Sequence, residues 1–378
     1  MDFGFDIQDL SGATLHKPLS PLGFDTLDYT PFEQLLEHIR QLPDKRAKVG
    51  NKALSVNGVV TSDSMEKYLN HGGESSSLLK EALKSPRHYY IARLADKPKP
   101  KNSRHFEFGT FVHSAVLEPD KFSKVRIMPD VNLSTLEGCH SMLRFLADTL
   151  SINLDVTVTE WKIHALRDEI KQLLDEAHAQ GYSFISSEDA TIIDIVRAGF
   201  NTYGGGILPK LMKFVRPETS FYGNDPSTGL SVKIRPDGLL LEEDFGVNAI
   251  LSVKTTSAIS VDAFIADCAR YRYELSEGMY LKVASEITGR PFTATLMLMI
   301  QSVIPFQMAL LFWDAEDLQI GKYKYAQALD IVKECRESNT WPGFDALAEE
   351  GAFGIIQAKL PSFIKSELKP QYIGNDGY

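Results

Sequence analysis

The sequence predicts an α/β domain in which a mixed central β-sheet is flanked by helices. Three observations lead to this fold class. Apolar residues recur with the period of two that is typical of strands between residues 220 and 255. A second strand-like apolar stretch begins near residue 293. Helical spacing lies before, between and after these two regions, and the order helix, hairpin strands, helix, strands, helix favours a sheet covered by helices.

Composition and charge limit the class of protein. The chain has 378 residues, of which 43% are hydrophobic and 24% charged, which is typical of a globular protein. The first residues carry acids and no basic segment, and no stretch approaches the ~20 apolar residues of a membrane span, so we expect a cytoplasmic protein without a membrane partner. The formal charge of -10 argues against indiscriminate coating of nucleic acid, although a local basic groove is compatible with it.

The three cysteines, Cys139, Cys268 and Cys335, are far apart and odd in number. Neither a disulfide framework nor a zinc knuckle is expected from that spacing. We therefore expect buried or incidental thiols. An iron–sulfur cluster held by four cysteines is also excluded.

The first 73 residues are expected to form an N-terminal appendage with one helix at 31–42 and little periodicity afterwards. A helix is then expected from residue 78, interrupted or restarted by Pro86. Lys80, Lys84 and Arg87 lie in this region and are candidate contacts to DNA, although a solvated helix face explains their charge equally well.

The remaining elements are predicted from hydrophobic periodicity and from the positions of glycine and proline. A helix begins near Gly109 and carries His113. The region of about 137–202 looks mainly helical and is expected to be an insertion between core elements. Strands are expected at 220–222, 231–235, 239–241 and 249–255, a long helix at 261–288, two further strands within 293–313, and a last helix at 321–337.

The most informative segment is KIRPDGLLLEEDFGVNAILSVKTT. If EEDFGVN forms the turn of a β-hairpin centred between Asp244 and Phe245, Asp237 lies opposite Ser252. Side chains alternate along a strand, so Asp237, Ser252 and Lys254 project from one face. A carboxylate and a lysine in one pocket suit metal-assisted phosphodiester hydrolysis, whereas taken alone such a pair is more often an exposed ion pair.

Several longer strings resemble successive blocks of the RecE-like (exonuclease VIII) family of the PD-(D/E)XK nucleases, in the family's order. The resemblance covers roughly residues 74–365 and leaves 366–378 as a tail. The strings are SSLLKEALKSPRHYYIARL, FEFGTFVHSAVLEPDKF, PETSFYGNDPSTGLSVKIRPDG, ILSVKTT and YKYAQALDIVKECRESNTWPGF.

This resemblance implies a restriction-endonuclease-like core with a helical insertion, and it implies roles for four residues. His113 matches the family's metal-binding histidine, and Asp237 matches its central metal-binding aspartate. Lys254 matches the catalytic lysine. Glu218 matches an acidic position that supports the catalytic site.

Two positions depart from the family pattern. Ser252 stands where the family has its second acid, and Ser276 stands where its QxxxY helix signature has glutamine, while Tyr280 is retained. A hydroxyl in place of a carboxylate removes one negative charge from the metal site. We hypothesise that Glu277 or Glu274 supplies the missing charge, because both lie in the helix that the family turns toward its site.

The resemblance implies an exonuclease that degrades linear duplex DNA from 5′ to 3′ with Mg²⁺ or Mn²⁺. It also implies a ring-shaped homo-oligomer, duplex DNA ends as ligands, a single-strand annealing (RecT-like) protein as partner, and phage or prophage origin in a bacterial host cell. The alternative is a DNA-end-binding recombination scaffold that has kept the fold and lost the chemistry at Ser252. An endonuclease or nickase on the same core is not separated from these by sequence.

Overall fold

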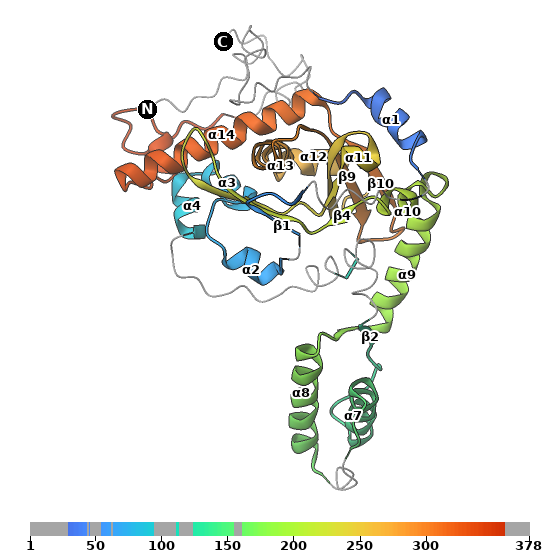
Figure 1. Cartoon of the computed structure of the whole chain (residues 1–378). Coiled ribbons are helices and arrows are strands. Elements are labelled where there is room, and N and C mark those ends of the chain that lie inside the picture. Colours follow the sequence, from blue (N-terminus) through green and yellow to red (C-terminus); the bar gives the residue numbers. More distant parts are fainter. Residues whose placement is uncertain are drawn as a thin grey trace, which may run out of the picture.

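Figure 1 shows the computed structural model of the chain, in which an α/β body carries a projecting pair of helices. The described residues are 29–43, 45, 54–61, 63–93, 111–112, 124–154 and 161–359. Two expectations lie wholly or largely outside them, namely the tail 366–378 and the helix from Gly109 that carries His113.

The body is built around a five-stranded sheet with the order β10-β9-β8-β7-β4. The neighbouring strands β8 and β9 run parallel, and the other pairs are antiparallel. The predicted mixed central sheet is therefore confirmed. The strands are β4 (Arg216–Pro217), β7 (Gly238–Leu240), β8 (Asn248–Thr256), β9 (Phe292–Gln301) and β10 (Met308–Phe312).

Helices cover both faces of this sheet because its strands are apolar on both sides. Ile250 of β8 packs with the helices of one face, whereas Ala249 and Leu251 pack with those of the other. The first face is covered by α3 (Ser76–Ala82), α12 (Val261–Arg270), α13 (Tyr273–Thr288) and α14 (Ala315–Ser338), and the second by α1 (Phe32–Arg40), α9 (Ser187–Thr202) and α10 (Ile207–Met212).

The hairpin of β7 and β8 has the predicted register. Gly238 lies opposite Leu251 and Leu239 opposite Ile250, which places the centre of the connection between Asp244 and Phe245. The connection is not a simple turn, however, because residues Glu242–Phe245 form the short helix α11, which ends at Gly246 with φ +85°. Its acids lie at the helix N-terminus, where negative charge is favourable.

A second, three-stranded sheet contains residues from the predicted appendage. Strand β1 (Val59–Val60) pairs with β5 (Ser220–Asn224), which pairs in turn with β6 (Ser231–Ile234). In addition, Leu35 of α1 is buried in the core between α10 and the central sheet. The described residues before 73 thus contribute to the core of the body, while the domain limits at 73 and 365 stay predictions.

The predicted long helix over 261–288 is wrong in one respect, because it is broken into α12 and α13. The break lies at Tyr271, the C-cap of α12, and Arg272, whose φ of +53° is left-handed. A left-handed residue cannot continue a right-handed helix, and for a side chain with a Cβ it costs about 1–2 kcal/mol. The last helix is longer than predicted, since Asp314 caps its N-terminus and it begins at Ala315.

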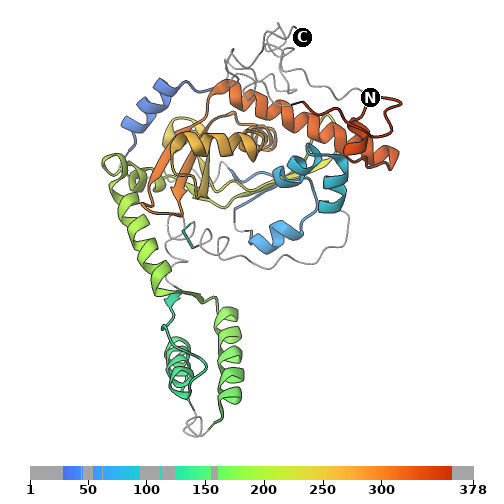
Figure 2. The ribbon, with the colours of Figure 1, turned by 180° about the vertical axis from the view of Figure 1, so that it is seen from behind.

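Helices α13 and α14 cross in close backbone contact. Figure 2 shows this side of the body from behind. The crossing point consists of Gly278 in α13 and Gly321 in α14. A Cβ on Gly321 would overlap the carbonyl oxygen of Glu274, and one on Gly278 would overlap the backbone of Lys322. Only glycine permits this close approach of the two helices.

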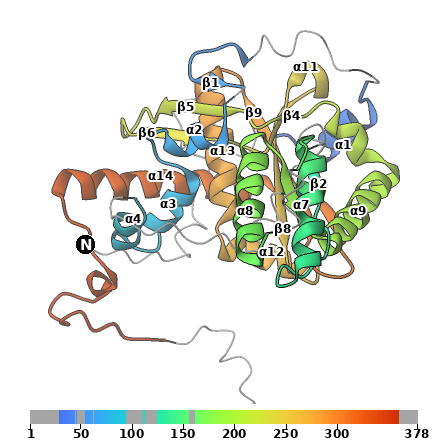
Figure 3. The same cartoon turned by 90° about the horizontal axis from the view of Figure 1, so that it is seen from below.

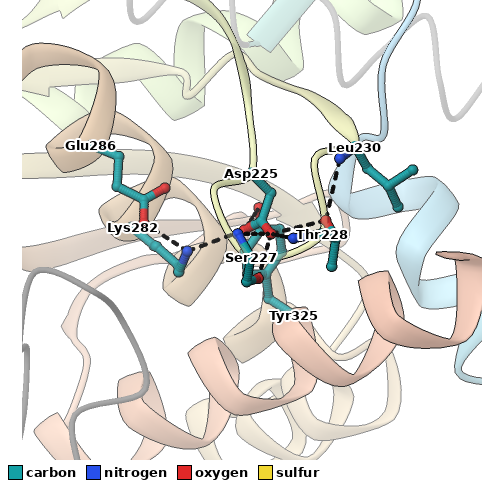
Figure 4. Close-up of polar contacts among 7 residues, drawn as sticks. All are labelled: Asp225, Ser227, Thr228, Leu230, Lys282, Glu286 and Tyr325. Carbon is teal, nitrogen blue, oxygen red and sulfur yellow. Dashed lines mark hydrogen bonds and ion pairs between the residues drawn. The ribbon is translucent and has the colours of Figure 1, made fainter.

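The tip of the β5–β6 hairpin is tied to both helices through Asp225 (Figure 4). Its buried carboxylate accepts hydrogen bonds from Ser227, Thr228 and the Tyr325 hydroxyl, and forms an ion pair of 3.2 Å with Lys282. Burial would raise the pKa of Asp225, but the hydrogen bonds and Lys282 hold it at about 2. The carboxylate therefore stays charged and anchors the hairpin to α13 and α14.

The region of about 137–202 is mainly helical, as predicted, but its helices have two different locations. Helices α7 (Leu136–Leu150) and α8 (Ile163–Ala179) pack on each other around their own apolar cluster. They project from the body on the side opposite to α14 (Figures 1 and 2), and Figure 3 looks along this projection. Helix α9 instead packs on the central sheet. Two short parallel strands, β2 (Val125–Ile127) and β3 (Ser183–Ile185), join the two parts.

The remaining elements are short and lie at the margin of the body. All three cysteines are free and buried, as expected. In the part of the chain that the structure describes, no helix combines the length and the apolar character needed to cross a membrane. The short elements are α2 (Met65–Asn70), α4 (Pro86–Arg93), η5 (Tyr203–Gly205) and η6 (Phe344–Leu347).

Candidate active site

The candidate site lies where β7 begins and β8 ends, on the sheet face that α13 covers. The Asp237 carboxylate accepts a hydrogen bond of 2.6 Å from the backbone N–H of Val253 and lies 3.4 Å from the Lys254 ammonium nitrogen. Both side chains are about one quarter exposed, at 23% and 26%. The alternation along the strand therefore brings Asp237 and Lys254 together, as the hairpin register predicts.

Ser252 and Glu277 form the buried floor of the site. The Ser252 hydroxyl donates a hydrogen bond of 2.7 Å to Oε1 of Glu277, and both residues are fully buried. The second oxygen of Glu277, Oε2, is buried and has no hydrogen-bond partner among the described residues. A carboxylate thus reaches the position at which the sequence has a serine in place of an acid, and one of its oxygens is left without a donor.

Burial changes the ionisation of Glu277. Desolvation raises the pKa of its carboxyl to about 7, although Lys254 and the Ser252 hydroxyl both act to lower it. The nearby Asp237 carboxylate raises it further. Near neutral pH the carboxyl is therefore poised between its neutral and charged forms, and a cation beside it would favour the charged form.

Lys254 remains positively charged. Burial alone would lower the pKa of its ammonium group, but the charge of Asp237, with smaller contributions from Tyr280 and Glu277, raises the pKa above its ordinary value. A lysine in this state donates hydrogen bonds and balances negative charge. It does not accept a proton at neutral pH.

Glu218 supports the site through hydrogen bonds to residues around Asp237. Its carboxylate accepts a hydrogen bond of 2.7 Å from Arg235, which is buried and also donates to the Ser220 hydroxyl. Its own backbone N–H donates to the carbonyl oxygen of Asp237. Glu218 has a left-handed φ of +57°, and such strain in a residue with a Cβ is typical of functional sites. Glu218 therefore fixes the backbone that carries Asp237.

The helix-signature positions lie beside this centre. Tyr280 is close enough to Lys254, Asp237 and Glu277 for their charges to influence its ionisation, and desolvation raises its pKa to about 12. Its hydroxyl also forms a hydrogen bond with Ser76 of α3. Ser276 is buried in the same helix.

The structure distinguishes between the two acids proposed as substitutes for the missing carboxylate. Glu277 faces Ser252, as described above. Glu274 instead forms an ion pair of 2.6 Å with Lys324 of α14. The geometry favours Glu277 over Glu274 as the acid that completes the site.

The three candidate DNA contacts differ in location. The Lys80 ammonium nitrogen lies 4.9 Å from the centre of the Tyr273 ring, at the edge of the site. Lys84 forms an exposed ion pair with Glu81, and Arg87 donates to the carbonyl oxygen of Trp341. DNA binding by these residues stays a prediction, and Arg87 already has a structural role.

The residues present fit a hard divalent cation. Among the described residues no cluster of three histidine, cysteine, aspartate or glutamate side chains occurs, and His113 lies outside those residues. Asp237 and Glu277 nevertheless provide two carboxylates, and Glu277 Oε2 lacks a donor. Mg²⁺ is commonly held by one or two carboxylates together with waters and a substrate phosphate, so this set suffices.

Sequence reasoning missed two residues of the site. Arg235, which holds Glu218, lies two residues before Asp237 in the connection between β6 and β7. Tyr68 of α2 lies close enough to Tyr280 and Arg235 to be influenced by their charges, and burial raises its pKa. Nothing in the sequence around Tyr68 indicates that location.

Comparisons with known proteins give a match to one family and several structural likenesses, two of which are as follows. Residues 210–349 match the family described as a PDDEXK-like domain of unknown function (DUF3799). A crystal structure of a protein from Eubacterium rectale, provisionally named an exonuclease, has a TM-score of 0.45 and 14% identity, covering 81% of this chain and 98% of that one. The crystal structure of SSO0001 has a TM-score of 0.21 and 12% identity, covering 58% and 84%. No match was found among curated proteins.

The family match includes Glu218, Asp237, Ser252, Lys254 and Glu277. Together with the sheet topology it confirms the predicted fold class, a mixed α/β structure with a PDDEXK-like domain. Neither TM-score reaches 0.5, so the two likenesses add no argument about function.

Proposed function

We propose that this chain is a divalent-metal-dependent nuclease that hydrolyses the phosphodiester bonds of linear duplex DNA, as an exonuclease of the RecE-like type. One observation carries the proposal. Asp237, Lys254 and Glu277 converge on one point of the sheet face, and Glu277 is hydrogen-bonded to the serine that stands in place of the family's second acid. A purely structural ion pair of Asp237 and Lys254 would not need a second, buried carboxylate with an unpartnered oxygen.

Each residue has a task in this proposal. Asp237 and Glu277 would hold Mg²⁺ or Mn²⁺, which when bound polarises the phosphate and acidifies a water molecule. Val253 orients the Asp237 carboxylate through its N–H, and Ser252 orients that of Glu277 through its hydroxyl. Glu218 and Arg235 hold the backbone at Asp237. Strand β8 and helix α13 thus carry Ser252, Lys254 and Glu277, while Asp237 lies directly before β7.

Lys254 has an electrostatic role in this proposal. The charge of Asp237 raises the pKa of Lys254, which is therefore a cation at neutral pH in the metal-free chain. It therefore binds and orients the phosphate and stabilises the negative charge that grows as the new bond forms.

The alternative function is a DNA-end-binding recombination scaffold without catalysis. One observation favours it: the described residues bring only two carboxylates together, and burial keeps Glu277 largely neutral below pH 7. A weakly charged site binds a cation less firmly. An endonuclease or nickase would use the same residues and differ only in the form of DNA that it accepts.

The expected direction of digestion, oligomeric state and protein partner are also part of the proposal. Digestion from 5′ to 3′, a ring around the duplex and an annealing protein as partner follow from the resemblance of the quoted sequence blocks.

The test is digestion of a 5′-phosphorylated linear duplex and of a closed circular duplex, each with Mg²⁺ and with Mn²⁺. We expect the chain to degrade the linear duplex only, and Asp237→Ala to lose all activity. Cutting of the circle would indicate an endonuclease. If the chain is inactive with both cations and Ser252→Asp gains activity, the scaffold function is correct and the nuclease function is wrong.

A further inference from the structure

Lys80 is held in a fixed position at the edge of the candidate site. Its neighbours in α3, Leu79 and Ala82, are buried in the core that α3 shares with α13 and α14. Ser76, one turn earlier in α3, is hydrogen-bonded to Tyr280 of the site. The helix therefore cannot rotate without disturbing that core, and its single inward lysine has a defined location.

Two lysines from different elements converge on one aromatic ring. The ammonium nitrogen of Lys80 lies 4.9 Å from the centre of the Tyr273 ring, and that of Lys254 lies 5.9 Å from the same centre. Tyr273 is the first residue of α13 and precedes Glu277 by one helical turn. Lys80 thus lies at the edge of the site, near enough to Lys254 and Glu277 for their charges to influence its ionisation.

Lys80 differs from Lys254 in having no carboxylate as ion-pair partner within the described residues. Lys84, on the following turn, is paired with Glu81. Desolvation and the charge of Lys254 lower the pKa of Lys80 to about 8, against the opposing effect of Glu277 and Glu274. Lys80 is thus partly buried, repelled by Lys254 and without an ion-pair partner among the described residues. An anion placed between the two lysines would therefore stabilise its charged form strongly.

We propose that Lys80 is a second catalytic lysine, whose ammonium group binds a non-bridging oxygen of the same phosphate that faces Lys254. This inference rests on the proposed function and deepens it, because it assigns Lys80 to the phosphate being cleaved and not to the DNA backbone outside the site. In the hydrolysis a water oxygen bonds to phosphorus, the bond to the leaving sugar oxygen breaks, and a proton of the water ends on that oxygen. Lys80 contributes charge to this step and transfers no proton.

Lys84 provides a matched control. It lies four residues from Lys80 in the same region of the chain, carries the same charge, and is exposed with one surface ion pair. Lys80→Gln and Lys84→Gln therefore change the net charge equally and differ only in distance from the site. Lys80→Met, which keeps the apolar stem, serves as a second neutral variant if Lys80→Gln lowers the melting temperature.

The experiment uses a 5′-phosphorylated blunt duplex of roughly 20 base pairs, long enough for several phosphate contacts. Single-turnover cleavage is measured in Mg²⁺ at saturating protein, and binding is measured by fluorescence anisotropy in EDTA. We expect Lys80→Gln to lower the cleavage rate constant on the order of 100-fold. Lys84→Gln should leave it within about threefold of the parent, since Lys84 is exposed, is paired with Glu81 and has no contact with the described site residues. Lys80→Arg should retain most of the rate.

The outcomes separate the two proposals. If the parent cleaves and Lys80→Gln cleaves as fast as Lys84→Gln, the role of Lys80 is wrong and the nuclease function stands. If the parent binds the duplex without cutting it, the nuclease function is wrong, and the phosphate contact is then judged by binding alone, where Lys80→Gln must weaken affinity more than Lys84→Gln does. If the parent binds no duplex, both proposals are wrong.

Discussion

At the scale of single residues, the account depends on Glu277 taking the place of an absent acid. Ser252 alone would leave the sheet face with one carboxylate, Asp237. In the proposed site, the hydrogen bond from Ser252 to Glu277 places a helix carboxylate beside the position where the family pattern has an acid on the strand. The cost of this arrangement is a buried acid whose pKa burial raises to about 7.

This raised pKa predicts how stability depends on pH. Between its ordinary value of 4.5 and about 7, the folded chain holds a proton on Glu277 that the unfolded chain has released. The free energy of unfolding should therefore fall as pH rises through this window, by at most about 3 kcal/mol. Glu277→Gln removes this contribution, because glutamine does not ionise.

The measurement is denaturant unfolding of parent and Glu277→Gln at pH 5, 6, 7 and 8 in EDTA. The stability of the variant relative to the parent should increase with pH across this range. Equal pH dependence in the two proteins would show that Glu277 is not protonated in the folded chain.

The sequence is sufficient to predict part of this site at residue scale. Asp237, Ser252 and Lys254 could be placed on one face because the alternation along a strand is invariant and the register follows from the turn. The choice between Glu277 and Glu274 could not be made, since both lie on a helix whose rotation depends on what it packs against. The inward position of Lys80 could not be predicted for the same reason, because it depends on how α3 packs against α13.

At the scale of elements, the position of α13 decides where Glu277 lies. Its contact with α14 passes through Gly278 and Gly321, which bring the two backbones together. The break at Arg272 then separates α13 from α12 and allows each helix its own direction. The sequence does not indicate this break, because an apolar helical pattern continues across residues 261–288 and no proline or glycine interrupts it before Gly278.

Gly321→Ala tests the importance of this crossing. The added methyl group would overlap the carbonyl oxygen of Glu274 and push the helices apart, which should cost about 1–3 kcal/mol of stability. It should also lower nuclease activity, since Glu274 and Glu277 move with α13. Thermal unfolding and digestion measure the two effects, with Gly72→Ala as control because a Cβ there has no neighbour within 4 Å. A stable and fully active Gly321→Ala would refute the claim that this contact positions the site.

At the scale of the whole molecule, a net negative charge is combined with two lysines that lie together at the candidate site. Its formal charge is -10, yet Lys80 and Lys254 converge on Tyr273. Such a distribution restricts a polyanion to one place on the surface and disfavours binding elsewhere. It is consistent with an enzyme that engages DNA at one site rather than coating it.

The projecting pair α7 and α8 is the feature of the whole molecule that sequence predicted least completely. The helical character of 137–202 was evident from its periodicity. An amphipathic helix has the same pattern whether its apolar face meets another helix or a sheet, so the sequence could not show that α7 and α8 pack on each other while α9 packs on the body.

The central claim is that Glu277 completes a divalent-metal site with Asp237, and the exchange of one carboxylate tests it most directly. Glu277→Gln and Glu274→Gln alter two acids three residues apart in the same helix, of which one faces Ser252 and the other pairs with Lys324. Mn²⁺ affinity and digestion of the linear duplex are measured for the parent and both variants. We predict that Glu274→Gln binds Mn²⁺ and cuts DNA like the parent, whereas Glu277→Gln loses at least about tenfold in Mn²⁺ affinity and loses digestion. A Glu277→Gln chain that binds Mn²⁺ and degrades DNA as the parent does would contradict the account.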